Sequence, residues 1–184
     1  FMPTIVNTGA ELVLFDTGLA PEAITGALAA AGYTPDQIDV VVLTHMHGDH
    51  IGGLSGEAGP TFAKARYVTG SVEHNHWSGA ANEGFDGKVK PLNDKMTMLE
   101  GGGTVAPGIT ALEAFGHSPG HMAYMIESGG QRLAITVNGA RRRDCSSEPY
   151  RRRLSRANGS AAAAACCPAP RVAAICSALS SIPG

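Results

Sequence analysis

Three histidines and one aspartate lie within six consecutive residues of this 184-residue chain, in the segment His45-Met46-His47-Gly48-Asp49-His50. Neutral imidazole nitrogens and carboxylate oxygens are the ligands that a borderline divalent cation prefers. Side chains two residues apart in an extended loop point the same way, so His45 and His47 can reach one cation. Asp49 and His50 follow at the expected start of a helix and can reach a second one. The spacing predicts chemistry by a metal-activated water.

A second histidine-containing segment, Gly116-His117-Ser118-Pro119-Gly120-His121, falls in a loop between two expected strands. His117 can supply the third imidazole that the first cation lacks. His121 begins the next strand, where we expect a structural role or one that supports the ligands. Taken alone, Ser-Pro-Gly also fits a plain tight turn with incidental histidines. Ser118 lacks the context of a nucleophile, so serine catalysis is not expected.

The elements that position these segments follow an α/β pattern. Residues 39–44 form a short, nearly all-apolar stretch, typical of a strand buried on both faces, and the first histidine segment follows its carboxyl end. Residues 80–94 are expected to be loop, with at most a helical turn. We expect further strands at 4–7, 12–15, 65–69, 95–99, 108–115, 122–127 and 132–137, helices at 21–31 and 71–78, and a capped helical turn at 34–37. Ser71 is the expected cap of the second helix.

The second expected helix carries two histidines and a tryptophan. His74 and His76 lie two residues apart, do not share a helix face, and are expected to be exposed to solvent. Trp77 is expected to pack in the core or in the wall of a pocket. The pair Cys166-Cys167 has no matching second pair, so no zinc site is expected there.

Charge and cysteine content divide the chain near residue 137. Residues 1–137 hold six Lys and Arg against fourteen acids, a net charge of −8, and all seven histidines. Residues 138–184 hold eight Arg against two acids, a net charge of +6, and all four cysteines. We therefore expect one α/β domain over 1–137 and an atypical tail over 138–184. The tail fits either a disordered basic segment or a shifted reading frame.

The two histidine segments together resemble the metallo-β-lactamase fold superfamily. The resemblance rests on Thr44 to Leu54 and on Gly116 to His121, and Leu14-Phe15-Asp16-Thr17-Gly18 is similar to the family's early strand and turn. Within the superfamily, the chain looks most like the lactonase and organophosphate-hydrolase-like branch. The resemblance implies an αββα sandwich with a dinuclear zinc site at one edge, here expected to be incomplete at both ends.

The resemblance also implies roles for individual residues. It assigns the first zinc to His45, His47 and His117, and the second zinc to Asp49 and His50. Asp49 would also act in catalysis, by positioning the nucleophile and accepting a proton. Asp16 would orient the site, although Asp-Thr-Gly is also ordinary turn chemistry.

Two departures from the family affect the second zinc. Asn138 stands near the position of the family's bridging aspartate, and no histidine follows His121. A neutral amide replaces a bridging carboxylate poorly. We therefore expect a nearly complete first site and a second site that is short of ligands, with weak zinc binding and slow or no turnover.

The expected function is a zinc-dependent hydrolase that directs a metal-activated hydroxide at a small-molecule ester, lactone or phosphoester-type substrate. A mononuclear iron sulfur dioxygenase of the same fold and an inactive metal-binding fragment are the alternatives. The acidic residues 1–137 offer no basic stripe, which argues against nucleic acid. No prediction of the oligomeric state follows.

Membrane and compartment signals are weak. No run approaches the roughly 18 apolar residues of a membrane span. No secretory signal is visible, but the chain starts at Phe1, so the native amino terminus is expected to be missing. The compartment stays open, with the cytoplasm slightly favoured.

The hypothesis that residues 138–184 come from a shifted reading frame can be tested directly. Arg, Ala, Gly, Ser, Pro and Cys are the residues that a GC-rich coding sequence yields in a wrong frame, and these residues dominate 138–184. We expect the nucleotide sequence around codon 138 to continue the α/β pattern in another frame. Two alternative frames that both lack this pattern would refute the hypothesis.

Overall fold

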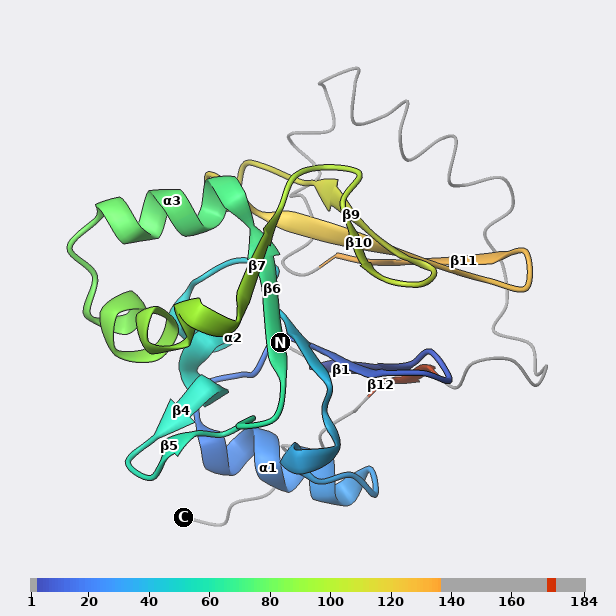
Figure 1. The fold of residues 1–184 in the computed structure, drawn as a ribbon, viewed down its shortest axis with the longest axis horizontal. Helices are drawn as coiled ribbons and strands as arrows, with labels where there is room; N and C mark the ends of the chain where they lie inside the picture. Colours follow the sequence, from blue (N-terminus) through green and yellow to red (C-terminus); the bar gives the residue numbers. More distant parts are fainter. Residues whose placement is uncertain (1–2, 137–171, 175–184) are drawn as a thin grey trace, which may run out of the picture.

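The computed structural model describes residues 3–136 and 172–174, which form two β-sheets packed face to face (Figure 1). The six-stranded sheet has the order β12-β1-β2-β3-β6-β7, and the four-stranded sheet has the order β11-β10-β9-β8. A two-stranded hairpin, β4 with β5, stands apart from both sheets. The predicted α/β sandwich is therefore confirmed. The tail predicted over 138–184 lies outside the described residues, apart from the three residues of β12.

The six-stranded sheet is mixed. Its strands are β1 (Thr4–Asn7), β2 (Leu12–Phe15), β3 (Val40–Val42), β6 (Arg66–Gly70), β7 (Met96–Leu99) and β12 (Val172–Ala174). β1 pairs antiparallel with both β2 and β12, whereas β2, β3, β6 and β7 run parallel to one another. The hairpin of β1 and β2 has the bounds that the sequence predicted. The parallel strands bring their carboxyl ends to one edge of the sheet, where the first histidine segment follows β3.

The four-stranded sheet is antiparallel throughout. Its strands are β8 (Thr104–Ala106), β9 (Ile109–Glu113), β10 (Met122–Ser128) and β11 (Gln131–Ile135). The turn between β10 and β11 uses Gly129 and Gly130, both with positive φ, so the predicted hairpin is confirmed. β8 was not predicted, because this short strand lies in a stretch that reads as a glycine-rich turn.

The helices differ from the predicted elements more than the strands do. α1 (Pro21–Ala30) starts at its proline as predicted, and the predicted turn after Thr34 is a 3-10 helix (Pro35–Gln37). α3 (Ser71–Gly79) has Gly70 at the capping position, so Ser71 is the first helical residue and the predicted cap is wrong. The remaining helical segments are α2 (Gly48–Ile51), Gly52–Leu54, Phe85–Val89 and Lys90–Lys95.

The stretch expected to be loop is largely helical between residues 85 and 95. Phe85, Val89 and Leu92 are buried in the core, and burial of these side chains stabilises turns that Gly87 and Pro91 obscure in the sequence. Tertiary packing therefore outweighs local propensity here.

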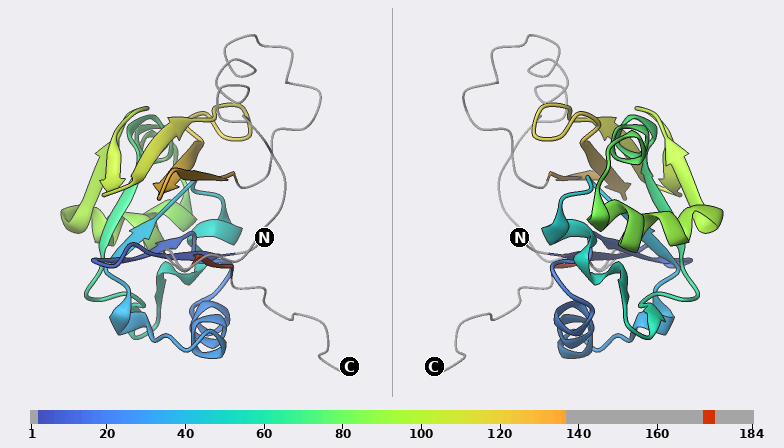
Figure 2. Two further views of the ribbon diagram at one scale, coloured as in Figure 1. Left: turned by 90° about the vertical axis from the view of Figure 1, so that its right-hand side faces the viewer. Right: turned by 90° about the vertical axis from the view of Figure 1, so that its left-hand side faces the viewer.

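Alternate residues of the six-stranded sheet supply two separate cores. Ile5, Leu14 and Val41 pack on the helical side, together with α1 and the helical turns at 85–95. Their neighbours face the other way and pack against the four-stranded sheet; they include Val6, Val13, Phe15, Val40 and Val42. β3 is thus buried on both faces, as predicted. Figure 2 shows α1 on the side of this sheet that faces away from the four-stranded sheet.

The outer face of the four-stranded sheet has no helix among residues 3–136 and 172–174. The described part of the chain therefore supplies three of the four layers of the predicted αββα sandwich. In this part of the chain, no helix has the length and apolar character needed to cross a membrane.

Candidate metal centre

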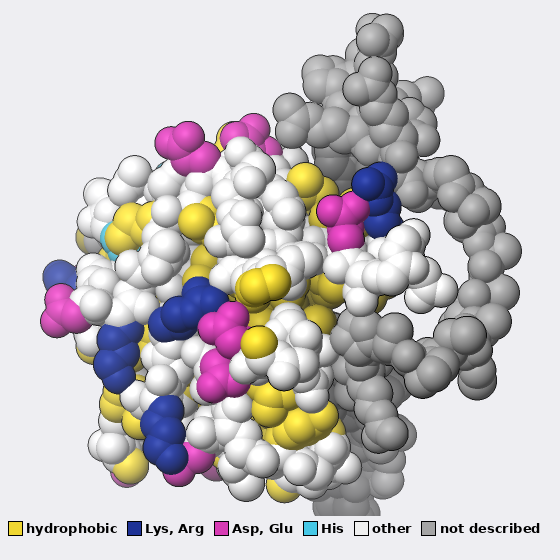
Figure 3. Space-filling view, turned by 45° about the vertical axis from the view of Figure 1, so that its right-hand side comes forward, with side chains coloured by type: hydrophobic (Ala, Val, Ile, Leu, Met, Phe, Trp, Pro, Cys, Tyr) yellow, Lys and Arg dark blue, Asp and Glu magenta, His cyan; other side chains and the backbone are white. Residues whose placement is uncertain are grey.

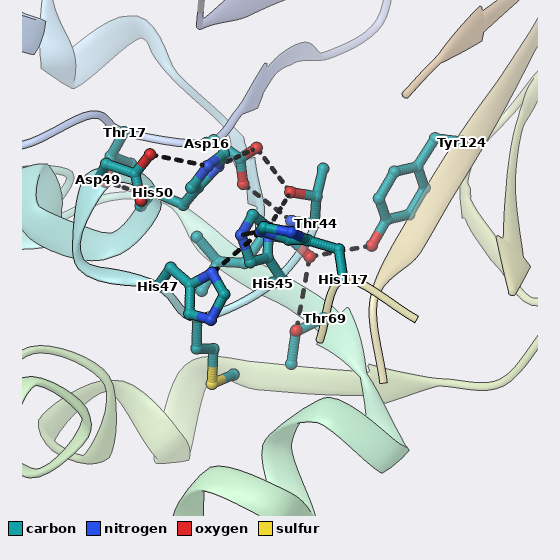
Figure 4. A network of polar contacts seen from close by, with 12 residues as sticks. Asp16, Thr17, Thr44, His45, His47, Asp49, His50, Thr69, His117 and Tyr124 are labelled. Carbon is teal, nitrogen blue, oxygen red and sulfur yellow. Dashed lines mark hydrogen bonds and ion pairs between the residues drawn. The ribbon is translucent and has the colours of Figure 1, made fainter. Parts of the chain in front are cut away.

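Three imidazoles converge at the edge where the two sheets meet (Figure 4). His45 and His47 come from the loop between β3 and α2, and His117 comes from the loop before β10. His117 Nε2 lies 3.1 Å from His47 Nδ1 and 3.2 Å from His45 Nε2. One nitrogen from each ring lies within 4.8 Å of the other two.

Two of the distances between these nitrogens fit a shared metal ion. Nitrogens about 2.0–2.1 Å from a tetrahedral zinc ion are roughly 3.3 Å apart, close to the 3.1 and 3.2 Å that separate His117 Nε2 from His47 Nδ1 and His45 Nε2. Neutral imidazoles also have the lone pairs that such an ion requires. His45 is buried, His47 is half-buried and His117 is exposed, so the cluster is open to solvent on one side.

Hydrogen bonds to Asp16 determine which nitrogen of His45 faces the cluster. Asp16 accepts hydrogen bonds from the Thr44 backbone N–H and from the Thr44 hydroxyl, each at 2.8 Å. Because that hydroxyl has donated its only hydrogen, its oxygen can only accept from His45 Nδ1, 3.0 Å away. The lone pair of His45 is therefore on Nε2, the atom that points toward His117.

Asp16 fixes His50 in the same way. His50 Nδ1 lies 3.0 Å from Asp16 Oδ2 and donates to it, which leaves the Nε2 lone pair 3.4 Å from the Asp49 carboxylate. Asp16 is buried and has φ 57°, the only positive φ of a non-glycine residue in the part of the chain that the structure describes. This conformation holds the carboxylate beneath both histidines, so Asp16 does more than form a turn.

Two glycines hold α2 against the loop that carries Asp16. The backbone N–H and the hydroxyl of Thr17 both donate to the His50 carbonyl at 2.8 Å. A Cβ at Gly52 would lie 2.1 Å from the Leu19 carbonyl oxygen, and a Cβ at Gly53 would lie 2.2 Å from the Thr17 carbonyl oxygen. The Gly-Gly pair after the histidine segment is therefore a steric requirement of the site.

His121 lies behind the three convergent imidazoles. Its ring centroid is 4.8 Å from that of His45 and 5.6 Å from that of His117. Its Nε2 is buried without a hydrogen-bond partner among the described residues. Burial and, secondarily, the neighbouring His117 lower the pKa of His121 to about 4. The supporting role expected of His121 stays a prediction.

The cluster favours neutral imidazoles. Burial, and then the proximity of His50 and His121, lowers the pKa of His45 to about 2. Desolvation, and then His47, lowers the pKa of His117 from its usual 6.5. Neutral imidazole is the form that binds a metal ion, so the site is prepared for a cation at neutral pH.

The structure corrects one expectation for α3 and agrees with two. His74 is 6% exposed, and its Nε2 lies 3.0 Å from Asn93 Oδ1, so the prediction of a solvated side chain is wrong. The cause is the helical segment around Phe85, which covers His74 and was expected to be loop. His76 is exposed, and Trp77 stands edge-on to His47 with ring centroids 5.6 Å apart.

Sequence reasoning missed Glu73, a fully buried carboxylate on α3. It accepts hydrogen bonds from the Met46 backbone N–H at 3.0 Å and from the Trp77 indole at 2.6 Å. One signal was available, because Glu73 lies four residues before Trp77 and therefore shares its helix face. A charged residue on the face expected to be buried marks a functional or structural anchor.

Two packed sheets with a histidine-rich edge define an α/β sandwich with a candidate metal site. A sequence model of the Metallo-beta-lactamase superfamily matches residues 3–136, and the chain belongs to that superfamily. An N-acyl homoserine lactonase of Bacillus thuringiensis is 29% identical over 120 residues, which cover 64% of this chain and 45% of the lactonase. Exodeoxyribonuclease WalJ of Streptococcus pneumoniae is 29% identical over 113 residues, which cover 61% of this chain and 39% of WalJ.

Similar solved structures are also metal-dependent hydrolases and lactonases. A probable metal-dependent hydrolase from Staphylococcus aureus is 27% identical with a TM-score of 0.65, over 72% of this chain and 55% of that chain. AidC, a dizinc quorum-quenching lactonase, is 25% identical with a TM-score of 0.61, over 71% of this chain and 53% of AidC. The chain thus spans less than half the length of the curated relatives and just over half that of these structures.

The lowered histidine pKa values predict a pH-dependent stability of the metal-free protein. In the unfolded chain His121 binds a proton below about pH 6.5, whereas in the folded protein it binds one only near pH 4. The folded state therefore loses stability as the pH falls from 6.5 to 4. His121→Gln should reduce the slope of the unfolding free energy by about 1.4 kcal/mol per pH unit in this window. Urea denaturation from pH 7 to pH 4 measures the slope.

His76→Gln is the matched control, because it removes an exposed histidine from α3. This control should leave the slope unchanged. An equal slope in His121→Gln and the unmodified protein would contradict the prediction.

Proposed function

We propose that this chain is a zinc-dependent hydrolase of small-molecule esters or lactones, with zinc held by His45, His47 and His117. The observation that carries the proposal is the convergence of the three imidazole nitrogens, with separations of 3.1 and 3.2 Å at an open edge of the fold. The lactonase relatives support a carbonyl substrate, since AidC was solved in complex with a product, N-hexanoyl-L-homoserine.

The chemistry divides between the cation and the protein. A bound zinc ion supplies Lewis acidity and lowers the pKa of water to about 7. Asp49 is half-exposed and lies 3.4 Å from His50, where it can accept the proton of an attacking water and position that water. Asp16 fixes the tautomers of His45 and His50. The exposed side of the cluster, at His117, admits the substrate.

A second zinc would depend on Asp49 and His50. The only group of three or more ligand residues found among residues 3–136 is that of His45, His47 and His117. Asn138, which stands near the position of the family's bridging aspartate, lies outside the described residues. We therefore propose one tightly bound zinc ion per chain, a weaker second site and slow turnover.

A phosphodiester substrate is the second candidate, because an exodeoxyribonuclease is as similar to this chain as the lactonase is. The prediction against nucleic acid therefore stays a prediction. On the face shown in Figure 3, Lys and Arg side chains alternate with Asp and Glu and form no continuous basic stripe. This face therefore offers no continuous basic track for a phosphate backbone.

Metal removal and one ligand substitution test the function. Zinc-loaded protein should open N-acyl homoserine lactones, should lose this activity in a chelator, and should regain it with zinc. His47→Ala should lower zinc affinity at least tenfold and abolish hydrolysis, because one of three imidazoles is gone. A pH-stat measures ring opening, and elemental analysis measures zinc per chain.

His76→Ala is the control for this test, since it removes a histidine that lies outside the cluster. Activity that survives chelation, or wild-type zinc affinity in His47→Ala, would contradict the proposal. Two tightly bound zinc ions with fast hydrolysis would contradict the weak second site. Bound iron with oxygen uptake on a persulfide would favour the sulfur dioxygenase.

A further inference from the structure

One buried side chain is hydrogen-bonded to both histidine segments. Glu73 Oε1 accepts from the Met46 backbone N–H at 3.0 Å, and Met46 stands between His45 and His47. Glu73 Oε2 accepts from the Gly120 backbone N–H at 2.9 Å. The Ser118 hydroxyl, next to His117, lies 2.5 Å from both carboxylate oxygens. Glu73 comes from a third element, α3, and is 0% exposed.

The four partners of Glu73 are all hydrogen-bond donors. They are the backbone N–H groups of Met46 and Gly120, the indole N–H of Trp77 and the hydroxyl of Ser118. A carboxylate only accepts, and its two oxygens offer about four lone-pair sites. The number and type of groups therefore match. A glutamine of the same shape would turn an N–H₂ group toward one of these donors and leave both unsatisfied.

Close backbone contacts hold the second histidine segment against α3. A Cβ at Gly120 would lie 2.0 Å from the Glu73 nitrogen and 2.5 Å from its Cα. A Cβ at Gly70 would lie 2.7 Å from Met122 Cγ and 3.1 Å from the Gly120 oxygen. The turn at Ser118-Pro119-Gly120 thus packs directly on the start of α3. The serine and the glycine of this turn both serve the contact with Glu73.

The geometry points to Glu73 as a positioning residue for the metal centre. We propose that its carboxylate sets the separation of His117 from His45 and His47 by bonding to the backbone or hydroxyl beside each of them. It also holds the Trp77 indole perpendicular to the His47 ring, at a centroid distance of 5.6 Å. The proposal rests on the proposed metal site, but it does not require any particular substrate.

A merely structural role predicts a different result. If Glu73 only satisfied donors within the core, substitutions would change stability without changing zinc affinity in the folded protein. A positioning role predicts that zinc affinity falls while the fold is retained. Groups that support metal ligands typically contribute roughly 10- to 100-fold in affinity.

Glu73→Gln in the full chain is the most direct test. We expect zinc affinity, measured by competition with a chromophoric chelator, to fall roughly 10- to 100-fold. In metal-free protein, amide hydrogen exchange should become faster at Met46 and Gly120, whereas the Gly53 amide, bonded to the Gly18 carbonyl, stays protected. Glu57→Gln is the matched control, because it removes the same charge at an exposed turn between β4 and β5.

Zinc affinity within about twofold of the wild type, or unchanged protection of both amides, would overturn the proposal. If Glu73→Gln does not fold, Ser118→Ala decides, since it removes one donor and keeps the carboxylate. Its zinc affinity should fall severalfold, and an unchanged affinity would overturn the proposal. Both readouts are made without substrate, so failure to hydrolyse a lactone would count against the proposed function alone.

Discussion

The crowding of neutral imidazoles is the constraint on which the rest of this structure depends. The ring of His45 has four other imidazoles around it, with centroid distances of 3.9 Å to His50, 4.7 Å to His47 and His117, and 4.8 Å to His121. A charge on a neighbouring ring disfavours protonation of His45 and His121, and burial already opposes charge on both. Hydrogen bonds to Thr44 and Asp16 fix the rings of His45 and His50, and the proposed cation would compensate the lone pairs of the cluster.

Two buried carboxylates from different elements hold this cluster. Asp16, at the end of β2, fixes His50 directly and His45 through Thr44. Glu73, on α3, holds the backbone around Met46 and the turn before His121. Each carboxylate lies where a glycine allows one backbone to approach another closely. The sheet sandwich brings these elements to one edge, and the hydrogen bonds then determine ring orientation and spacing.

Much of this arrangement could be predicted from the sequence, because its signals are local. Two short strand-like runs around Gly9 predicted the first hairpin, and the apolar run before Thr44 predicted the doubly buried β3. The spacing of the two histidine segments predicted which imidazoles meet. Glu73, buried His74 and the helical turns at 85–95 could not be predicted this way. Their environments arise from packing between segments distant in sequence, and the only local signal among them is the four-residue spacing of Glu73 and Trp77.

The central claim is that His45, His47 and His117 bind one metal ion together. X-ray absorption at the zinc edge, on the full chain loaded with one zinc equivalent, tests it most directly. The account predicts three imidazole nitrogens at about 2.0–2.1 Å, one fewer when His117 is replaced by Ala. A zinc environment without imidazole scattering, or one that His117→Ala leaves unchanged, would contradict it.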